Sequence, residues 1–545
     1  MKQEDKVSYK IIQPLLLSAC IAIGMMVGYK MNEKPENSLV DVSDYPLDSM
    51  MMTGRVEELI RFIESKYVTK INSNELIETA LTAVFEKLDP HSMYLSPEEL
   101  EEVNDQMDGA YNGIGIENFL IDDTVNISSV IQNGPADKAG LRAFDKIISI
   151  NDQVVAGKSM EYSEIRSLLN QEKGTKIQLT VLRGKKVVPY SLSVDEVPVR
   201  TVVSEFIPDI KTVLIRIERF GSNTYKEFME DVEKYFANNS AHHLIIDLRD
   251  NPGGFLPEAT NILCQIFEEK DKLLLYTEGR NSKKNEYKSN GKRFFKVDQV
   301  AVLIDENSAS ASEIIAGAIQ DWDRGVIIGR RSYGKGLVQE QYNLTNGGAI
   351  RLTVARYYTP SGRSIQRDYA DRDTYDGDFG ERYRNGDLFH KDSISNKNGD
   401  KYYTQILRRE VSGFGGITPD IFIPLDSVYK DEQIFGYKSF LSEFAFKYVS
   451  LHRNEIPDKI KLFNEWKLPA SIYREFEGYI KTHSDSTTVF NEVTVKKLER
   501  ELKSNVARYM FDKKTYQANE ILQDEFVISA IRAIKENKTT ALKNK

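Results

Sequence analysis

The segment Asp305–Glu313 combines side chains that a hydrolase could use. Three serines alternate with alanines there, directly after the apolar run Val300–Ile304 and before a helical pattern. Glu313 follows Ser310 at the spacing of a capping box, which places Ser310 at the N-cap and Ala311 at the first helical position. The free N–H groups and positive dipole end of a helix N-terminus would stabilise an oxyanion formed beside Ser310. Ser310 is therefore the candidate nucleophile, although an isolated SxxE pattern is usually only a helix cap.

A serine hydroxyl is a weak nucleophile and needs a base. The six histidines show neither a recognisable hydrolase context nor metal-ligand spacing, whereas Lys335 stands between two glycines, Gly334 and Gly336. A lysine serves as a base only where burial lowers its pKa from about 10.4 toward neutrality. Gln339, four residues on, could hold the neutral amine by a hydrogen bond. A GKG triplet is also typical of a surface turn, but the spacing of a phosphate-binding loop is absent.

A third signal is the glycine pair Gly253-Gly254, which ends the segment Leu248–Gly254 after another buried strand pattern. A glycine pair can turn backbone N–H groups inward as a second oxyanion donor, and a tight turn is the alternative. Each of the three signals is weak alone. Together, each at the end of a core strand, they outline a Ser/Lys hydrolase site.

The elements that must position these residues alternate between strand and helix from about residue 200 to 365. Strand patterns occupy 213–217, 244–248, 300–304 and 326–328, and helical patterns occupy 224–237, 257–268 and 311–323. This alternation predicts a layered α/β core, which we place at 200–425. Residues 367–405, rich in Asp, Arg, Asn, Gly and Tyr, have little periodicity and predict an insertion or a mobile loop.

Residues 108–196 have a different hydrophobic periodicity, in which apolar and polar residues alternate. Alternating strand patterns at 125–131, 145–151 and 176–182 surround a short helix at 134–141, which predicts a β module ahead of the core. Helical patterns precede the β module and follow the core. Helices at 56–67 and 74–88 predict a helical N-terminal domain over 51–105, and amphipathic patterns at 493–510 and 520–535 predict a helical region over 427–545 that supports the core or dimerises.

The N-terminal 30 residues predict a membrane anchor. Three lysines precede the largely apolar stretch Ile11–Tyr29, which at 1.5 Å per residue comes close to spanning a bilayer core of about 30 Å. The positive flank stays cytoplasmic, so we expect an anchor in the inner membrane, a linker at 31–50 and the rest of the chain on the periplasmic side. A cleavable signal peptide, and a lipoprotein modified at Cys20, are the alternatives. All three export the protein.

Composition excludes several classes of function. A chain of 545 residues is too long for one core. Its net charge of −9 provides no basic face for nucleic acid. With only two cysteines there is no disulfide framework or cysteine metal site, and we expect neither a metal nor a cofactor.

Eight segments in order resemble the C-terminal processing (tail-specific) serine proteases over residues 55–425. They are 88–92, 113–116, 134–141, 248–254, 308–314, 334–336, 351–363 and 415–420. The resemblance implies a multidomain α+β protein with a layered, crotonase-like protease core and an inserted PDZ domain. It implies Ser310 as nucleophile, Lys335 as base and Gln339 as the residue that completes the site. It implies an oxyanion hole made by the Ala311 N–H and one of Gly253 or Gly254.

The resemblance also assigns a role to residues 108–196, which look like the PDZ module of that family. A substrate tail would add as a strand, and the N–H groups around Gly113, Ile114, Gly115 and Ile116 would capture its terminal carboxylate. The function implied is an endopeptidase that cuts near the C-termini of exported or partly unfolded proteins, with a homo-oligomer or an adaptor as possible partners. A catalytically silent binding protein and a PDZ scaffold remain the alternatives.

Overall fold

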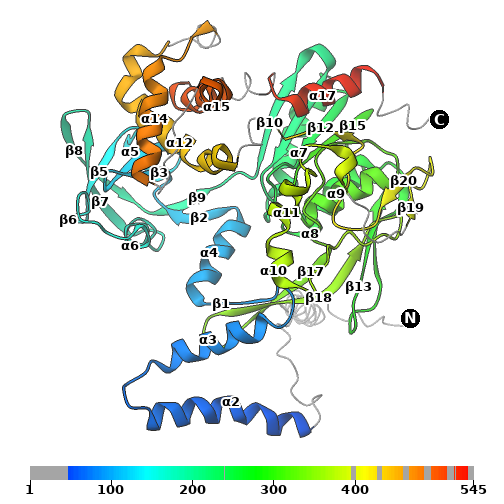
Figure 1. Ribbon diagram of the computed structural model, residues 1–545, viewed down its shortest axis with the longest axis horizontal. Coiled ribbons are helices and arrows are strands. Elements are labelled where there is room, and N and C mark those ends of the chain that lie inside the picture. Colours follow the sequence, from blue (N-terminus) through cyan, green and yellow to red (C-terminus); the bar gives the residue numbers. More distant parts are fainter. Residues whose placement is uncertain are drawn as a thin grey trace, which may run out of the picture. The chain divides into compact units, whose positions relative to one another are not determined.

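The computed structural model describes residues 47–237, 240–394, 401–425, 432–457, 465–483, 492–511, 521 and 523–537. Contacts divide the chain into a first unit, Met1–Ala83, and a second unit, Val84–Lys545 (Figure 1). The predicted anchor at 1–30 lies outside the described residues. Within the described ranges, no helix is both long and apolar enough to cross a membrane.

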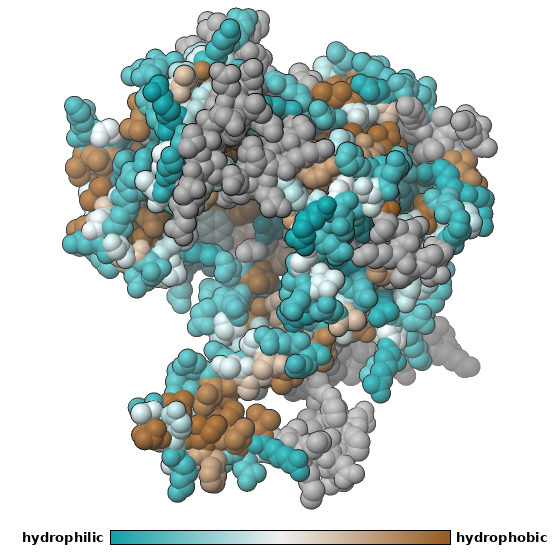
Figure 2. Space-filling view, viewed as in Figure 1, coloured by the Kyte–Doolittle hydropathy of each residue, from teal (hydrophilic) through white to brown (hydrophobic). Residues whose placement is uncertain are grey.

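The first unit is a pair of helices, α2 (Leu47–Lys66) and α3 (Ser73–Phe85), which continues two residues past the unit's end. The predicted helices are present, but Val56, Leu59 and Phe62 are 55%, 59% and 64% exposed. Figure 2 shows the resulting apolar surface on this helical pair. The helices therefore bury no core of their own among the described side chains of α3.

The predicted end of the N-terminal domain, at 105, differs from the structure. Strand β1 (Met93–Leu95) pairs with β18 (Ala349–Tyr358) in a sheet of the second unit. Helix α4 (Pro97–Asp108) follows, and its Leu100 is buried with Leu95 and Ala349. Residues 93–105 therefore pack with the second unit, because this small apolar cluster joins them to β18.

The main sheet of the second unit has the order β10-β11-β12-β15-β16-β21, and all its pairs are parallel except β10–β11. Its strands are β10 (Val202–Ile207), β11 (Thr212–Ile217), β12 (His243–Asp247), β15 (Gln299–Ile304), β16 (Val326–Gly329) and β21 (Ile421–Phe422). Every residue of β15 is buried, as the continuous apolar run predicted.

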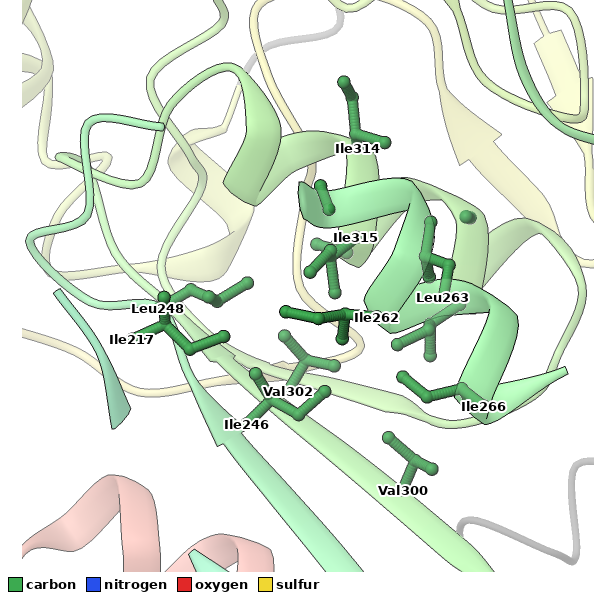
Figure 3. Close-up of a cluster of buried hydrophobic side chains, with 14 of the residues drawn as sticks. Ile217, Ile246, Leu248, Ile262, Leu263, Ile266, Val300, Val302, Ile314 and Ile315 are labelled. Carbon is green, nitrogen blue, oxygen red and sulfur yellow. The ribbon is translucent and has the colours of Figure 1, made fainter. Parts of the chain in front are cut away.

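Helices cover both faces of this sheet. On one face lie α7 (Thr224–Phe236), α8 (Leu256–Ile266) and α9 (Ala311–Asp321), whose apolar side chains form one core with the strands (Figure 3). On the other face α17 (Glu525–Lys535) buries Val527, Ala530 and Ile534 against the sheet. The predicted α/β layering is confirmed at this level. The core-supporting role predicted for the C-terminal helices is confirmed for α17.

A second sheet has the order β1-β18-β13-β14, and β17 (Leu337–Asn343) pairs with β18. Strand β13 is Lys270–Glu278 and β14 is Asn285–Asn290. The GKG triplet directly precedes β17. This places Lys335 at the entry of a strand and Gln339 on the strand itself.

The β module is a separate sheet of order β3-β4-β5-β7-β8, with β6 paired to β5. Its elements are β3 (Ile116–Ile121), β4 (Thr124–Val130), α5 (Pro135–Ala139), β5 (Lys146–Ile150), β6 (Gln153–Val154), α6 (Tyr162–Leu169), β7 (Lys176–Arg183) and β8 (Lys186–Ser193). A two-stranded ribbon of β2 (Ala110–Gly113) and β9 (Asp195–Pro198) leads into and out of it. Strand β3 is an edge strand, so one side of its backbone is open.

The expectation of a mobile loop within 367–405 is wrong for the residues described there. They include α10 (Arg372–Asp376), α11 (Asp378–Asn385), the 3₁₀ turn η3 (Lys391–Ser393) and β19 (Lys401–Tyr403), which pairs with β20 (Glu410–Ser412). Arg367 and Arg382 are buried and both contact Asp378, at 2.5 and 2.7 Å. Paired charges hold the segment together with a few buried side chains, Tyr375, Leu388 and Phe389, so its sequence has little hydrophobic periodicity to indicate a helix.

The remaining C-terminal helices are α12 (Glu432–His452), α14 (Ala470–His483) and α15 (Glu492–Met510). They share one apolar core, which also includes Leu388, Phe389 and Leu425. This core contacts the β module, where Phe446 stacks on Phe144 with ring centroids 4.8 Å apart. Helix α12 therefore contacts the β module, whereas α17 packs on the main sheet.

Candidate active site

Ser310 occupies the turn between β15 and α9. It is the N-cap of α9 and Ala311 is the first helical residue, as the capping spacing predicted. The Ser310 N–H donates to Glu313 Oε2 at 2.9 Å. Ser310 has φ 53° and ψ −113°. Such a conformation costs a non-glycine residue about 1–3 kcal/mol, and strain of this kind clusters at functional sites.

The two neighbouring serines have structural roles. Both are fully buried. The Ser308 hydroxyl donates to the Leu248 carbonyl at 2.8 Å, and the Ser312 hydroxyl donates to the Asn251 carbonyl at 3.1 Å. Only Ser310 of the three lines the main cavity of the core. Ser310 is therefore the one of the three serines that a substrate in the cavity can contact.

Lys335 and Gln339 lie on the same cavity as Ser310. Lys335 Nζ donates to Gln339 Oε1 at 3.0 Å. The Gln339 side-chain amide in turn donates to the backbone carbonyl of His91, which orients its oxygen toward the lysine. Within the described residues no hydrogen bond joins Lys335 Nζ to Ser310. The lysine must approach the hydroxyl before a proton can pass.

The environment of Lys335 favours its neutral form. Burial lowers its pKa from 10.5 to about 8, and the Arg351 cation adds to the lowering, while Asp89 and Glu313 oppose it. Arg351, on β18, lines the same cavity. At pH 7 a lysine with this pKa is neutral in roughly one molecule in ten, so an amine base is available.

The two candidate glycines differ in what their N–H groups do. The Gly253 N–H donates to Asn251 Oδ1 at 2.8 Å. For Gly254 and Ala311, no N–H donor bond is found among the residues that the structure describes. Gly253 instead gives room: a Cβ there would lie 2.7 Å from Ser310 Cβ and 3.0 Å from Ala311 N. Gly254 and Ala311 are therefore the pair whose N–H groups remain for an oxyanion.

Glu313 links the nucleophile's helix to the lysine loop, a role that the sequence did not reveal. Its buried carboxylate accepts from Ser310 N–H, from Lys335 N–H at 2.9 Å, from Gly334 N–H at 2.7 Å and from the Ser332 hydroxyl at 2.5 Å. Burial raises its pKa to about 7 against these bonds. One carboxylate thus fixes both loops of the site.

Three further residues support the site from outside the serine, lysine and glycine segments. The Tyr357 hydroxyl donates to the Ser310 carbonyl at 3.2 Å. Asp89 accepts from the Ser92 N–H and the Thr353 hydroxyl, and so fixes the turn that carries His91. The His91 ring pairs with the Tyr375 hydroxyl at 2.7 Å, and burial lowers its pKa to about 4, so it stays neutral. Asp89 and His91 lie in the segment 88–92 and Tyr357 lies in the segment 351–363, and the resemblance assigned none of the three a role.

The cavity has a volume of about 640 Å³, and a mixed lining. Apolar side chains beside Ser310 include Phe255, Ile314, Leu337 and Val338. Such a lining suits an apolar side chain of an extended chain, held next to the hydroxyl. The catalytic groups predicted from sequence are thus brought together around one cavity.

Two of the four predicted tail-binding residues line a second, smaller pocket, whereas Gly113 and Gly115 are not in its lining. Ile114 and Ile116 line it together with Ile165 and Leu169 of α6. The pocket lies along β3, whose outer edge pairs with no strand among the described residues. Within the described part of the chain, the N–H groups of Ile114 and Gly115 donate no hydrogen bond.

Comparisons with known proteins agree with this arrangement. Residues 211–375 match peptidase family S41, and residues 112–194 match the PDZ domain. The carboxy-terminal processing protease CtpB of Bacillus subtilis is 31% identical over 343 residues, which cover 62% of this chain and 70% of the relative. A carboxy-terminal-processing protease of Bartonella bacilliformis is 33% identical over 321 residues, covering 57% and 72%.

Among solved structures, the photosystem II D1 C-terminal processing protease matches with a TM-score of 0.34 and 23% identity, over 69% of this chain and 94% of that one. The sequence relatives are the stronger finding. Since two of them are more than 30% identical and are covered over more than two thirds of their length, the chain belongs to the C-terminal processing serine proteases of peptidase family S41, hydrolases of peptide bonds that carry a PDZ domain.

Proposed function

We propose that this chain is an exported endopeptidase with a Ser310/Lys335 dyad, which cuts near the C-termini of exported or partly unfolded proteins. The observation that carries the proposal is the contrast among three serines of one loop. Ser308 and Ser312 donate to buried backbone carbonyls, while Ser310 is strained and shares a cavity with a lysine of lowered pKa. The layering of the core, with helices between two sheets, is compatible with the crotonase-like class that we propose for it.

The chemistry follows from these groups. Lys335 Nζ takes the Ser310 proton while Oγ bonds to the substrate carbonyl carbon, and the oxyanion accepts from the N–H groups of Gly254 and Ala311. The protonated lysine then returns the proton to the leaving amine as the C–N bond breaks. Water then attacks the acyl-enzyme carbonyl, with Lys335 again taking and returning the proton, and the serine is restored. Gln339 holds the neutral amine without supplying a negative charge, which would keep it protonated.

We propose that the PDZ domain recruits substrate tails by strand addition to β3. A tail paired to this edge would place its last side chain against Ile114, Ile116 and Leu169, and its carboxylate against the N–H groups of Ile114 and Gly115. Asn118 Oδ1, in the same pocket, is buried and has no donor among the described residues. A polypeptide N–H could satisfy it.

For the N-terminus we propose the predicted anchor, with the protease on the periplasmic side and lipidation at Cys20 as the alternative. Carbonate extraction of membranes separates an integral chain from a peripheral one. A Cys20→Ala chain that still fractionates with the membrane supports the anchor. Its release into the soluble fraction supports the lipoprotein.

The experiment that tests the protease compares the full chain with Ser310→Ala and Lys335→Ala. The substrate is an unfolded protein with an apolar C-terminus, in the presence of EDTA. We expect cleavage by the parent and none by either variant. If the parent and both variants are equally inert while all three bind the tail, the chain is a binding protein and the dyad is refuted. Cleavage that survives Ser310→Ala refutes the nucleophile.

A further inference from the structure

Tyr111 lies beside the proposed carboxylate loop but belongs to no motif discussed above. It is on β2, two residues before Gly113, and its side chain lines the same pocket as Ile114, Ile116 and Asn170. A tail that reaches this loop must therefore end next to the Tyr111 side chain.

The ring of Tyr111 is held in place by the glycine of the loop. A Cβ at Gly113 would lie 2.5 Å from Tyr111 Cε2 and 3.2 Å from Asn170 Oδ1. Real Cβ atoms do not approach that closely, so the ring rests against the bare Gly113 backbone. Gly113 has no positive φ, so this packing explains the glycine better than backbone conformation does.

The hydroxyl of Tyr111 can donate a hydrogen bond. Burial raises the pKa of Tyr111, with Glu117 and Tyr162 adding to the rise and Arg166 and the Ile116 backbone N–H opposing it. The hydroxyl is therefore protonated at neutral pH. It donates to no acceptor in the part of the chain that the structure describes, so its hydrogen is available to a ligand in the pocket.

We propose that the Tyr111 hydroxyl is a specificity-determining donor, which binds one oxygen of the tail's terminal carboxylate while the N–H groups of Ile114 and Gly115 bind the other. The proposal rests on the tail recruitment proposed above and names the residue that makes it selective for a free C-terminus. The loop then offers three donors. A carboxylate accepts all of them, whereas an amidated end or an internal peptide bond has one oxygen and brings N–H groups that find no acceptor there.

The test uses the full chain carrying Ser310→Ala, so that binding is measured without turnover. The probe is a fluorescent peptide that ends in leucine, prepared once with a free carboxylate and once with a C-terminal amide. Its affinity is measured by fluorescence anisotropy for this chain and for Tyr111→Phe, which keeps the ring against Gly113. Tyr190→Phe is the matched control, because Tyr190 lies on β8 of the same domain and does not line the pocket.

We expect Tyr111→Phe to weaken binding of the free-acid peptide by roughly tenfold to a hundredfold, the contribution of a hydrogen bond to a charged acceptor. The amide should bind equally to both chains, and Tyr190→Phe should change the affinity for neither peptide. An equal loss for acid and amide would mean that Tyr111 is only structural. Unchanged or tighter acid binding by Tyr111→Phe would overturn the proposal. If the Ser310→Ala chain does not bind the free-acid peptide more tightly than the amide, the proposed tail recruitment is itself refuted, and the role of Tyr111 with it. That outcome differs from one in which the chain prefers the acid but Tyr111→Phe does not change its affinity.

Discussion

The pH dependence of cleavage tests the assignment of Lys335 as the base. Only the neutral amine accepts the Ser310 proton, so activity should rise with pH and level off above the pKa of the lysine. With a pKa of about 8, the neutral fraction rises roughly 90-fold between pH 6 and pH 9 and then reaches a plateau. A lysine at 10.5 would give about a thousandfold rise over the same range, with no plateau.

The causes of the lowered pKa make a second, finer perturbation possible. Arg351→Gln removes a cation that disfavours the protonated lysine, so the midpoint of the profile should move to higher pH. The variant should then lose activity at pH 7 and regain it at pH 10. Arg356→Gln on the same strand is the matched control, since Arg356 contacts the Tyr369 hydroxyl at 3.3 Å and does not line the cavity.

The assay is kcat/KM on a fluorogenic peptide from pH 5.5 to 10.5, at constant ionic strength. His91 should add no limb in this range, because burial holds its pKa near 4. Glu313, whose pKa burial raises to about 7, should add a limb below that of Lys335, since its carboxylate form accepts the hydrogen bonds that fix both loops. A flat profile, or a midpoint above 10 in the parent chain, would refute Lys335 as a base activated by burial. A midpoint that moves equally in Arg351→Gln and Arg356→Gln would refute the local electrostatic cause.

Three other substitutions probe the supports of the site. Glu313→Gln should lower kcat about a hundredfold with little change in KM, because one amide oxygen cannot replace a carboxylate that accepts four hydrogen bonds; steady-state kinetics measure the split. Asp321→Asn should destabilise folding by about 3–5 kcal/mol in chemical denaturation, since Asp321 and Arg363 are fully buried and 2.8 Å apart. Gly253→Ala should abolish cleavage while leaving peptide binding intact, because its Cβ would collide with Ser310.

The nucleophile could be predicted because its signals are local. A buried strand, a serine and a glutamate three residues on together specify a strand-to-helix turn, and the structure has Ser310 at that N-cap. The choice between Gly253 and Gly254 was left open, although a local signal existed. Asn251-Pro-Gly is an Asx-turn sequence, and its side chain takes the Gly253 N–H at 2.8 Å.

The rest of the site depends on contacts between segments distant in sequence. Gln339 is oriented by a carbonyl 248 residues earlier, and Tyr357 supports the Ser310 carbonyl across 47 residues. Arg351 influences Lys335 because β17 and β18 pair, a register that periodicity alone does not specify. The helices within 367–405 were missed for a related reason: Arg367 and Arg382 are buried by pairing with Asp378, so the segment has little apolar pattern to read.

The position of Glu313 bears on how the dyad is completed. Its carboxylate holds the N–H groups of Ser310, Gly334 and Lys335, so the backbones that carry nucleophile and base are fixed relative to each other. The lysine amine nevertheless donates to Gln339 and has no hydrogen bond to Ser310 among the described residues. The adjustment that joins them must therefore come from side-chain rotation of Lys335 about its flexible stem, and not from movement of the loops. When Lys335 rotates, its amine changes or breaks its hydrogen bond to Gln339, which the His91 carbonyl holds in place. The turn that Asp89 fixes therefore influences how readily the base reaches the serine.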